Sequence, residues 1–332
     1  AYGYDLQNYA TKTFVQSVLP VPNAIINGNF DIWQRAISQT ASGLGSDDRW
    51  YNQLTGTTQV ASRQAFALGQ TDVPNNPKYY ARTVVSSVAG AANRAFKVQH
   101  IEGVETFAGT TATLSFWAKA DANKNIAVEF YQGFGTGGSP STGIESIGVT
   151  TVALTTSWVK HTVSVAIPSI SGKTLGTDGN DYLQLAFWLD AGSNYNARTN
   201  SLGQQSGTFE FSQVQMEAGA VASTFYPRTV GEELALCQRY YQDSGYVYYQ
   251  VLARFSAGAG SALAWWTWGV PMRGAPSVTT NATWSTGSGF AGVPAFFSAT
   301  TSGCYLRAAL GNAVANGIQY LNGGNIYASA EL

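Results

Sequence analysis

The sequence has 332 residues, of which 45% are hydrophobic and only 11% are charged, with a formal net charge of −1. A chain of this length can bury substantial cores and is more typical of two domains than of one. The low charge excludes the long-range field that attracts nucleic acids or anionic membranes, so neither is expected as a partner. Many Val, Tyr, Phe and Trp residues with Gly-rich breaks favour short antiparallel strands over helices.

Residues 1–23 are predicted to form an N-terminal arm for docking or oligomer contact. The segment is polar and ends in LPVPN, whose two prolines fix an extended chain before the first strand. It lacks a signal-peptide profile, so export by the Sec route is not expected. No apolar run approaches the roughly 20 residues that span a bilayer, so membrane insertion is not expected either.

Residues 24–228 are predicted to form the larger domain, because strand patterns alternate there with turn clusters such as GTGGSPSTG. Three strands can be assigned face by face, since successive side chains point to opposite sides of a sheet. They are TATLSFWAK, NIAVEFYQ and DYLQLAFWLD, and each has one aliphatic face: Ala112, Leu114, Phe116 and Ala118; Ile126, Val128 and Phe130; Leu183, Leu185, Phe187 and Leu189. These faces indicate the core of a jelly-roll β-sandwich.

The opposite faces of the same strands are polar and aromatic. In carbohydrate sites, flat aromatic rings cover the apolar face of a pyranose, while amide and carboxylate groups exchange hydrogen bonds with its hydroxyls. The residues of this kind are the candidate glycan-binding set: Trp117, Glu129, Tyr131, Gln184, Trp188 and Asp190. A face that packs on another sheet or on a neighbouring subunit also collects Trp and Tyr. The sequence leaves these two interpretations open.

The pattern changes after residue 228. Segment 229–243 has apolar residues at helical spacing, and Thr229 and Glu232 match a capping box, which predicts a linking amphipathic helix. From residue 244 to 332 the sequence returns to strands and turns and predicts a second, smaller β-sandwich. The expected fold class is therefore all-β, with one linking helix between two sandwich domains.

Motifs that carry enzyme chemistry are scarce. The sequence has 2 histidines and contains no GxSxG, HExxH or P-loop, so no catalytic residue is assigned and no enzyme is expected. Cys237 and Cys304 belong to no CxxC or metal-ligand pattern, and no metal ligand is assigned. Two carboxylates on separate strands suffice for glycoside hydrolysis, and Glu129 and Asp190 are candidates by face. We favour hydrogen-bonding roles for both.

A succession of blocks resembles a known group of proteins. The blocks include NGNFDIWQR from Asn27, DDRWYN from Asp47, NARTNSLG, GTFEFSQVQMEAGAVASTFYPRTVGEELALCQRYYQ, PMRGAPSVTT and the terminal ASAEL. In order and spacing they are similar to bacteriophage virion proteins described as tail-fibre or tail proteins, over nearly the whole chain beyond residue 23. The resemblance implies a larger domain similar to a carbohydrate-binding-module jelly roll. It also implies a homo-oligomeric virion component that contacts other virion proteins, faces the bacterial surface and is made in the host cytoplasm.

Modules of this kind often hold a structural calcium between the first strand and an Asp pair in the last strand. Here the first strand offers Asn29 and Asp31, but the matching part of FEFSQVQME has Ser212 and Gln213 where acids would be expected. This departure argues against calcium, and no cofactor is predicted.

The resemblance also suggests a structural role for a group of conspicuous residues near strand ends. These are Trp33, Arg35, Asp48, Arg49 and Trp50. An Arg–Asp pair framed by tryptophans is interpreted as a fold-specifying cluster, not as a ligand site.

The function expected from the sequence is that of a phage virion structural protein, in the tail fibre or receptor-binding apparatus, that recognises a host surface glycan without turnover. A trimer is expected by analogy with phage fibres. The alternative is a purely architectural capsid-decoration, collar or tail-adaptor protein without a glycan ligand. A polysaccharide depolymerase is the third and least favoured hypothesis.

Overall fold

The computed structural model describes residues 23–245, 247–253, 261–281, 283–284, 295–309 and 317–332. The predicted arm of residues 1–23 lies outside the described residues except for Asn23. The chain divides after residue 230 into two compact units, with Leu332 grouped with the first. Each unit is described by itself.

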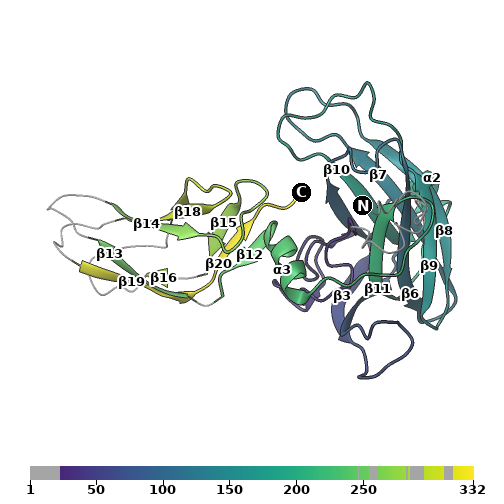
Figure 1. Ribbon diagram of the computed structural model, residues 1–332. Coiled ribbons are helices and arrows are strands. Elements are labelled where there is room, and N and C mark those ends of the chain that lie inside the picture. Colours follow the sequence, from purple (N-terminus) through teal and green to yellow (C-terminus); the bar gives the residue numbers. More distant parts are fainter. Residues whose placement is uncertain (1–22, 246, 254–260, 282, 285–294, 310–316) are drawn as a thin grey trace, which may run out of the picture. The chain divides into compact units, whose positions relative to one another are not determined.

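The first unit is a sandwich of two antiparallel sheets (Figure 1). One sheet has the order β1 (Ser38–Gln39), β3 (Thr58–Ala65), β4 (Tyr79–Ser86), β11 (Gly207–Ala218), β6 (Thr111–Ala120), β9 (Val159–Ala166), and we call it the β11 sheet. The other has the order β2 (Tyr51–Thr55), β5 (Arg94–Glu102), β10 (Tyr182–Ala191), β7 (Lys124–Gly133), β8 (Ile144–Leu154), and we call it the β10 sheet. Neighbouring strands are mostly distant in sequence, as in a jelly roll, so the predicted fold class is confirmed.

The core lies between the two sheets. Every residue of the predicted aliphatic faces on β6, β7 and β10 is fully buried in one hydrophobic cluster. Phe116 of β6 meets Phe187 of β10 edge-on, with ring centroids 4.9 Å apart. The face-by-face interpretation is thereby confirmed for all three strands, because the alternation period of a strand fixes which side chains can reach the opposite sheet.

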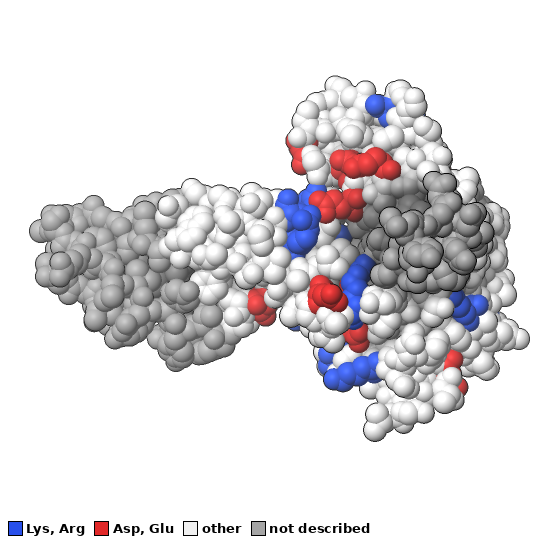
Figure 2. All heavy atoms as spheres, in the orientation of Figure 1, with Lys and Arg blue, Asp and Glu red and all other residues white. Residues whose placement is uncertain are grey.

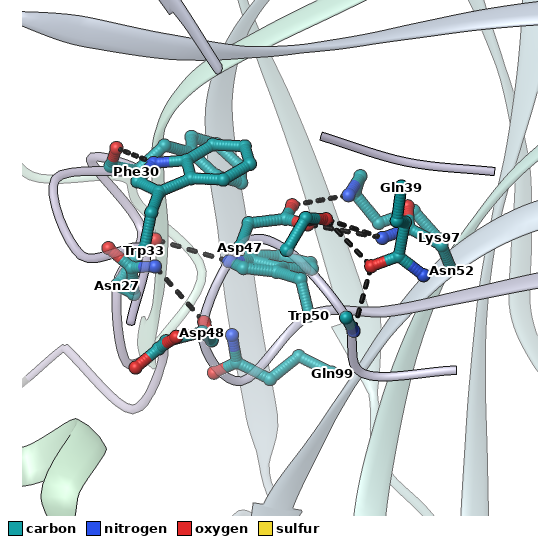
Figure 3. A network of polar contacts seen from close by, with 12 residues as sticks. Asn27, Phe30, Trp33, Gln39, Asp47, Asp48, Trp50, Asn52, Lys97 and Gln99 are labelled. Atoms are coloured by element: carbon teal, nitrogen blue, oxygen red, sulfur yellow. Dashed lines mark hydrogen bonds and ion pairs between the residues drawn. The ribbon is translucent and has the colours of Figure 1, made fainter. Parts of the chain in front are cut away.

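A buried polar network lies beside this core (Figure 3). Lys97 of β5 points inward and its ammonium forms an ion pair with Asp47, although both side chains are almost wholly buried. Asp47 also accepts hydrogen bonds from Ser46 Oγ (2.7 Å) and Asn52 Nδ2 (3.1 Å). Desolvation lowers the pKa of Lys97, and the Asp47 carboxylate opposes that shift. The network ties the loop that precedes β2 to the centre of the β10 sheet.

The predicted fold-specifying cluster adjoins this network. Fully buried Trp50 donates its indole N–H to Asn27 O at 3.1 Å, and Trp33 donates to Phe30 O at 2.6 Å (Figure 3). Asp48 accepts the Gln34 backbone N–H at 3.0 Å and lies 4.0 Å from Arg35 Nη1, while Arg49 Nη2 donates to His100 O at 2.7 Å. These contacts are those of a structural cluster.

The residues considered for calcium offer one carboxylate, Asp31, and buried oxygens of Asn29, Ser212 and Gln213 that have no hydrogen-bond partner. Asn29 turns its amide N–H to Asp31 Oδ2 (2.9 Å), and the Gln213 amide N–H donates to Pro74 O (2.6 Å). Burial raises the pKa of Asp31, the single carboxylate there. Calcium needs six to eight oxygen ligands, including carboxylates. The described part of the chain holds no group of three or more His, Cys, Asp or Glu side chains placed to bind a metal.

The second unit contains α3 (Val230–Gln238) and three small antiparallel sheets. Their strand orders are β12 (Tyr241–Asp243), β20 (Ile326–Ser329), β15 (Ser277–Thr280); β13 (Val247–Ala253), β19 (Gly317–Gly324), β16 (Thr283–Trp284); and β14 (Ser261–Thr267), β18 (Gly303–Ala309), β17 (Ala295–Phe297). None of the helices among the described residues has both the length and the apolar character needed to cross a lipid bilayer.

The predicted helix over 229–243 is shorter in the structure. Helix α3 ends at Gln238, and Tyr241–Asp243 instead forms β12, which pairs with β20 from Tyr241↔Ser329 to Asp243↔Tyr327. Tyr240 and Tyr241 are buried. Pairing with a strand from the end of the chain supplies backbone hydrogen bonds to this segment, so tertiary context overrides the helical spacing.

Candidate functional site

A groove lies on the face of the β10 sheet that points away from the core. Its volume is about 310 Å³, at the lower end of ligand pockets. All of its lining residues come from β2, β5, β7, β8, β10 and the segment after β10: Gln53, Arg94, Phe96, Tyr131, Glu145, Tyr182, Gln184 and Arg198. They carry aromatic rings, amides, guanidinium groups and one exposed carboxylate.

The strand register places small residues on the same face of the sheet as the groove. Ala186 of β10 lies opposite Val98 of β5 on one side and Glu129 of β7 on the other. Ala186 and Val98 are small, and the Glu129 carboxylate is buried in the hydrogen bonds described below. Larger side chains stand two residues away along β10 in each direction, at Gln184 and Trp188, on the same face. Ala186 and Val98 are buried with Phe96 and Trp188 in a second hydrophobic cluster, onto which Tyr51 also packs.

One end of the groove is aromatic. Tyr182 stacks on His100 with ring centroids 3.9 Å apart and planes at 17°, and Tyr131 lies 6.0 Å from Tyr182. Gln184 Oε1 lies 3.2 Å from His100 Nε2. Burial raises the pKa of the Tyr182 phenol, so the hydroxyl stays protonated at neutral pH and can donate a hydrogen bond.

Two glycines make room for the tyrosine rings. A Cβ placed on Gly143 would lie 1.9 Å from Tyr131 Oη, and one on Gly133 would lie 2.8 Å from the Tyr182 ring. Both distances are far below van der Waals contact, so a side chain at either position must displace the ring beside it. The two glycines do not line the groove, but their lack of a side chain allows the Tyr131 and Tyr182 rings to take their positions there.

We predict that Gly143→Ala weakens ligand binding in the groove by pushing the Tyr131 ring aside. The φ angle of Gly143 itself is not left-handed, so an added Cβ displaces the Tyr131 ring and does not strain the backbone. Affinity should fall about tenfold, as for loss of one aromatic contact, while the thermal midpoint changes little. Gly231→Ala is the matched control, since a Cβ there meets nothing within 4 Å. Gly172→Ala would not serve, because the positive φ of Gly172 would strain the alanine. Equal affinity of Gly143→Ala and the unaltered protein would contradict the prediction.

The other end of the groove is built on a stacked pair. Trp188 of β10 and Phe96 of β5 lie parallel, with centroids 4.2 Å apart and planes at 17°. The segment after β10, comprising η2 (Ser193–Tyr195) and α2 (Asn196–Thr199), packs Tyr195 against Trp188 at 5.3 Å. Trp188 consequently has no exposed surface. Two arginines, Arg94 and Arg198, extend over this stack toward the groove.

Glu129 anchors the stack from below. It accepts hydrogen bonds from Trp188 Nε1 (2.8 Å), from the Ser146 backbone N–H (3.0 Å) and, in bidentate fashion, from Arg198 Nε (2.7 Å) and Nη2 (2.9 Å). Its side chain is fully buried. Charge-assisted bidentate pairs are among the stronger hydrogen bonds in proteins. Glu129 therefore fixes the positions of Trp188 and Arg198.

The six predicted site residues do not share one surface. Tyr131 and Gln184 line the groove. Trp188, Glu129 and Asp190 have 0% exposure, so their placement does not offer a direct ligand contact. Asp190 accepts hydrogen bonds from Thr57 and Ser87 at 2.8 Å and from the Gln205 backbone at 2.7 Å. Trp117 lies on β6, in the other sheet. Alternation placed the faces correctly but could not show that η2 and α2 cover one part of them.

Sequence reasoning missed most of the residues that line the groove. Tyr182 alternates with Leu183 and so lies on the polar-aromatic face of β10, but it is not among the predicted candidates; Arg94 and Phe96 alternate on β5 in the same way as Glu129 and Tyr131 on β7. The alternation of RAFKVQ was the available signal for β5. No pattern in the segment around Arg198 predicts a role for it, because its contact with Glu129 joins residues 69 positions apart.

Several solved structures that are similar to this chain are carbohydrate-binding modules. No known protein family and no curated protein matches the sequence. Among solved structures, a family 4 carbohydrate-binding module (CBM4) is 17% identical with a TM-score of 0.32, and the match covers 58% of this chain and 98% of the module. A family 11 module from Clostridium thermocellum, in complex with a β-1,3-1,4-mixed-linked tetrasaccharide, is 9% identical with a TM-score of 0.32 and covers 56% and 98%.

One further similar structure comes from a virus. The enzymatically active domain of tailspike protein 4 of bacteriophage CBA120 is 12% identical to this chain, with a TM-score of 0.34. The match covers 59% of this chain and 21% of the tailspike chain, so it concerns about a fifth of that protein.

Proposed function

We propose that this protein binds a bacterial surface glycan, without turnover, in the groove on the β10 sheet. The observation that carries the proposal is the composition of the groove: two tyrosine rings stand beside two amides, Gln53 and Gln184, in one hollow of about 310 Å³. Tyrosine offers an apolar ring face together with a polar hydroxyl, and amides both donate and accept hydrogen bonds. A sugar ring presents the matching pair of apolar and hydroxyl surfaces.

Binding without turnover is supported by the state of the carboxylates. A glycosidase needs one carboxyl group to give up a proton and a second to act as nucleophile or base. Glu129 is saturated by the four donors described above, and Asp190 is buried among three donors away from the groove lining. Glu145 alone among the groove carboxylates is exposed, with 60% of its side-chain surface accessible. The arrangement favours recognition.

The proposed setting is a phage virion, in the tail fibre or receptor-binding apparatus. Support comes from the ordered sequence blocks that resemble phage tail-fibre proteins. The weakly charged surface agrees with a partner that is neither nucleic acid nor membrane: on the face seen in Figure 2, most of the described surface belongs to uncharged residues.

The test is binding of the full chain to an array of bacterial capsular and O-antigen polysaccharides, with release of reducing ends measured on every polysaccharide that is bound. We expect retention on a subset of glycans and no increase in reducing ends. Absence of binding across an array drawn from the host's own strains would overturn the proposal in favour of an architectural role. Reducing-end release would replace it with a depolymerase.

A further inference from the structure

The groove contains an arginine without an acidic partner. Arg94 Nη1 donates a hydrogen bond to Tyr195 Oη at 2.6 Å, and its guanidinium carbon lies 4.9 Å from the centre of the Tyr195 ring and 5.6 Å from that of Phe96. Among the described residues it forms no ion pair with Asp or Glu, and its Nε has no hydrogen-bond partner. A guanidinium has five N–H donors. The hydrogen bond to Tyr195 orients the Arg94 guanidinium and leaves most of its N–H donors unused.

The second arginine of the groove is compensated. Arg198 forms ion pairs with Glu129 (2.7 Å) and with Glu145 (3.5 Å). Both carboxylates belong to β7 and β8, whereas Arg94 belongs to β5. With the strand order β5, β10, β7, β8, three strand spacings separate β5 from β8, or roughly 14 Å at about 4.8 Å per strand. At the β7–β8 side of the groove, Arg198 pairs with the two carboxylates. At the β5 side, the positive charge of Arg94 has no acidic partner among the described residues.

We infer that the ligand of the groove is an acidic glycan, in which the carboxylate of a uronic acid residue pairs with Arg94. This inference rests on the glycan-binding function proposed above and adds the chemical class of the sugar. A planar guanidinium matches a carboxylate in bidentate geometry, and stacking on Tyr195 and Phe96 holds its plane in place. The tyrosines at the far end of the groove then contact the neighbouring sugar of the chain.

The experiment uses a panel of bacterial surface polysaccharides, each immobilised as isolated and again after carbodiimide-mediated reduction of its uronic acid carboxyls to primary alcohols. Reduction removes the charge and keeps the backbone and its linkages. The full chain should bind best to polysaccharides that contain uronic acid, and reduction should lower affinity at least about tenfold, as expected for loss of a hydrogen bond to a charged group.

Variants assign the effect to Arg94. Arg94→Gln should lose about tenfold in affinity for the acidic form, bind the reduced form as the unaltered protein does, and so abolish the discrimination. Arg94→Lys keeps the charge and should retain part of the preference, which separates charge loss from misfolding. Lys160→Gln, the same change of charge on β9 of the other sheet, is the matched control and should bind both forms normally.

The outcomes separate this inference from the proposed function. Binding to neutral polysaccharides alone, or equal binding before and after reduction, overturns the acidic ligand and leaves glycan binding intact. Unchanged discrimination in Arg94→Gln overturns the role of that residue. Failure to bind any polysaccharide, acidic or neutral, overturns the proposed function and the inference with it.

Discussion

Tyr182→Ala should lower the affinity of the protein for its glycan by about 30-fold, equivalent to roughly 2 kcal/mol, the level of a binding hot spot. Tyr182 is the ring at the centre of the aromatic end: it stacks on His100 and lies 6.0 Å from Tyr131. Its removal takes away the flat surface for a sugar and also loosens both neighbours. Titration calorimetry or affinity electrophoresis with a polysaccharide identified on the array measures the change.

Two control variants make this result specific. Tyr182→Phe keeps the ring and should retain most of the affinity, losing only the contribution of the hydroxyl. Trp117→Ala removes a larger ring from β6 of the other sheet and should leave binding unchanged. If Trp117→Ala abolishes binding while Tyr182→Ala does not, the ligand is bound on the β11 sheet, and the groove described above is the wrong site.

Lys97→Met should destabilise the first unit by about 3–5 kcal/mol, the range for breaking a buried ion pair by removing one partner. The side-chain exposures of Lys97 and Asp47 are 1% and 0%, so water cannot replace the lost ammonium. The Asp47 carboxylate would keep its hydrogen bonds from Ser46 and Asn52 but would lose its counter-charge. Urea unfolding followed by tryptophan fluorescence measures the change in free energy.

The double variant Asp47→Leu, Lys97→Met distinguishes the cost of an unpaired charge from the cost of altered packing. It removes both charges, so it should recover part of the lost stability, although Ser46 and Asn52 then lose an acceptor. Lys160→Met on the exposed face of β9 is the surface control and should change the free energy of unfolding by less than about 0.5 kcal/mol. A loss below about 1 kcal/mol in Lys97→Met would contradict this prediction and show that the ion pair contributes little to holding the loop before β2 on the sheet.

The sequence by itself determined the all-β fold class and the inward faces of three strands. Leu183, Leu185 and Phe187 alternate with Gln184 and Ala186, and in a strand that period of two places the three apolar side chains on one face, which packs in the core. It also determined where helical character begins, at Val230, because the spacing of apolar residues changes there. Local pattern is sufficient for these features because they depend on neighbours in sequence.

Tertiary structure alone decided which side chains meet and which are covered. The sequence places Trp188 on the polar-aromatic face of its strand but does not show what covers it; in the structure η2 and α2 fold over it, and Glu129 binds it from the adjacent strand. Segment 241–243 reads as helix but pairs with β20, more than 80 residues away. The groove depends in the same way on contacts between distant segments, such as Arg198 with Glu129. Sheet order, cross-strand register and loop cover are properties of the whole chain, and periodicity within one segment carries no information about them.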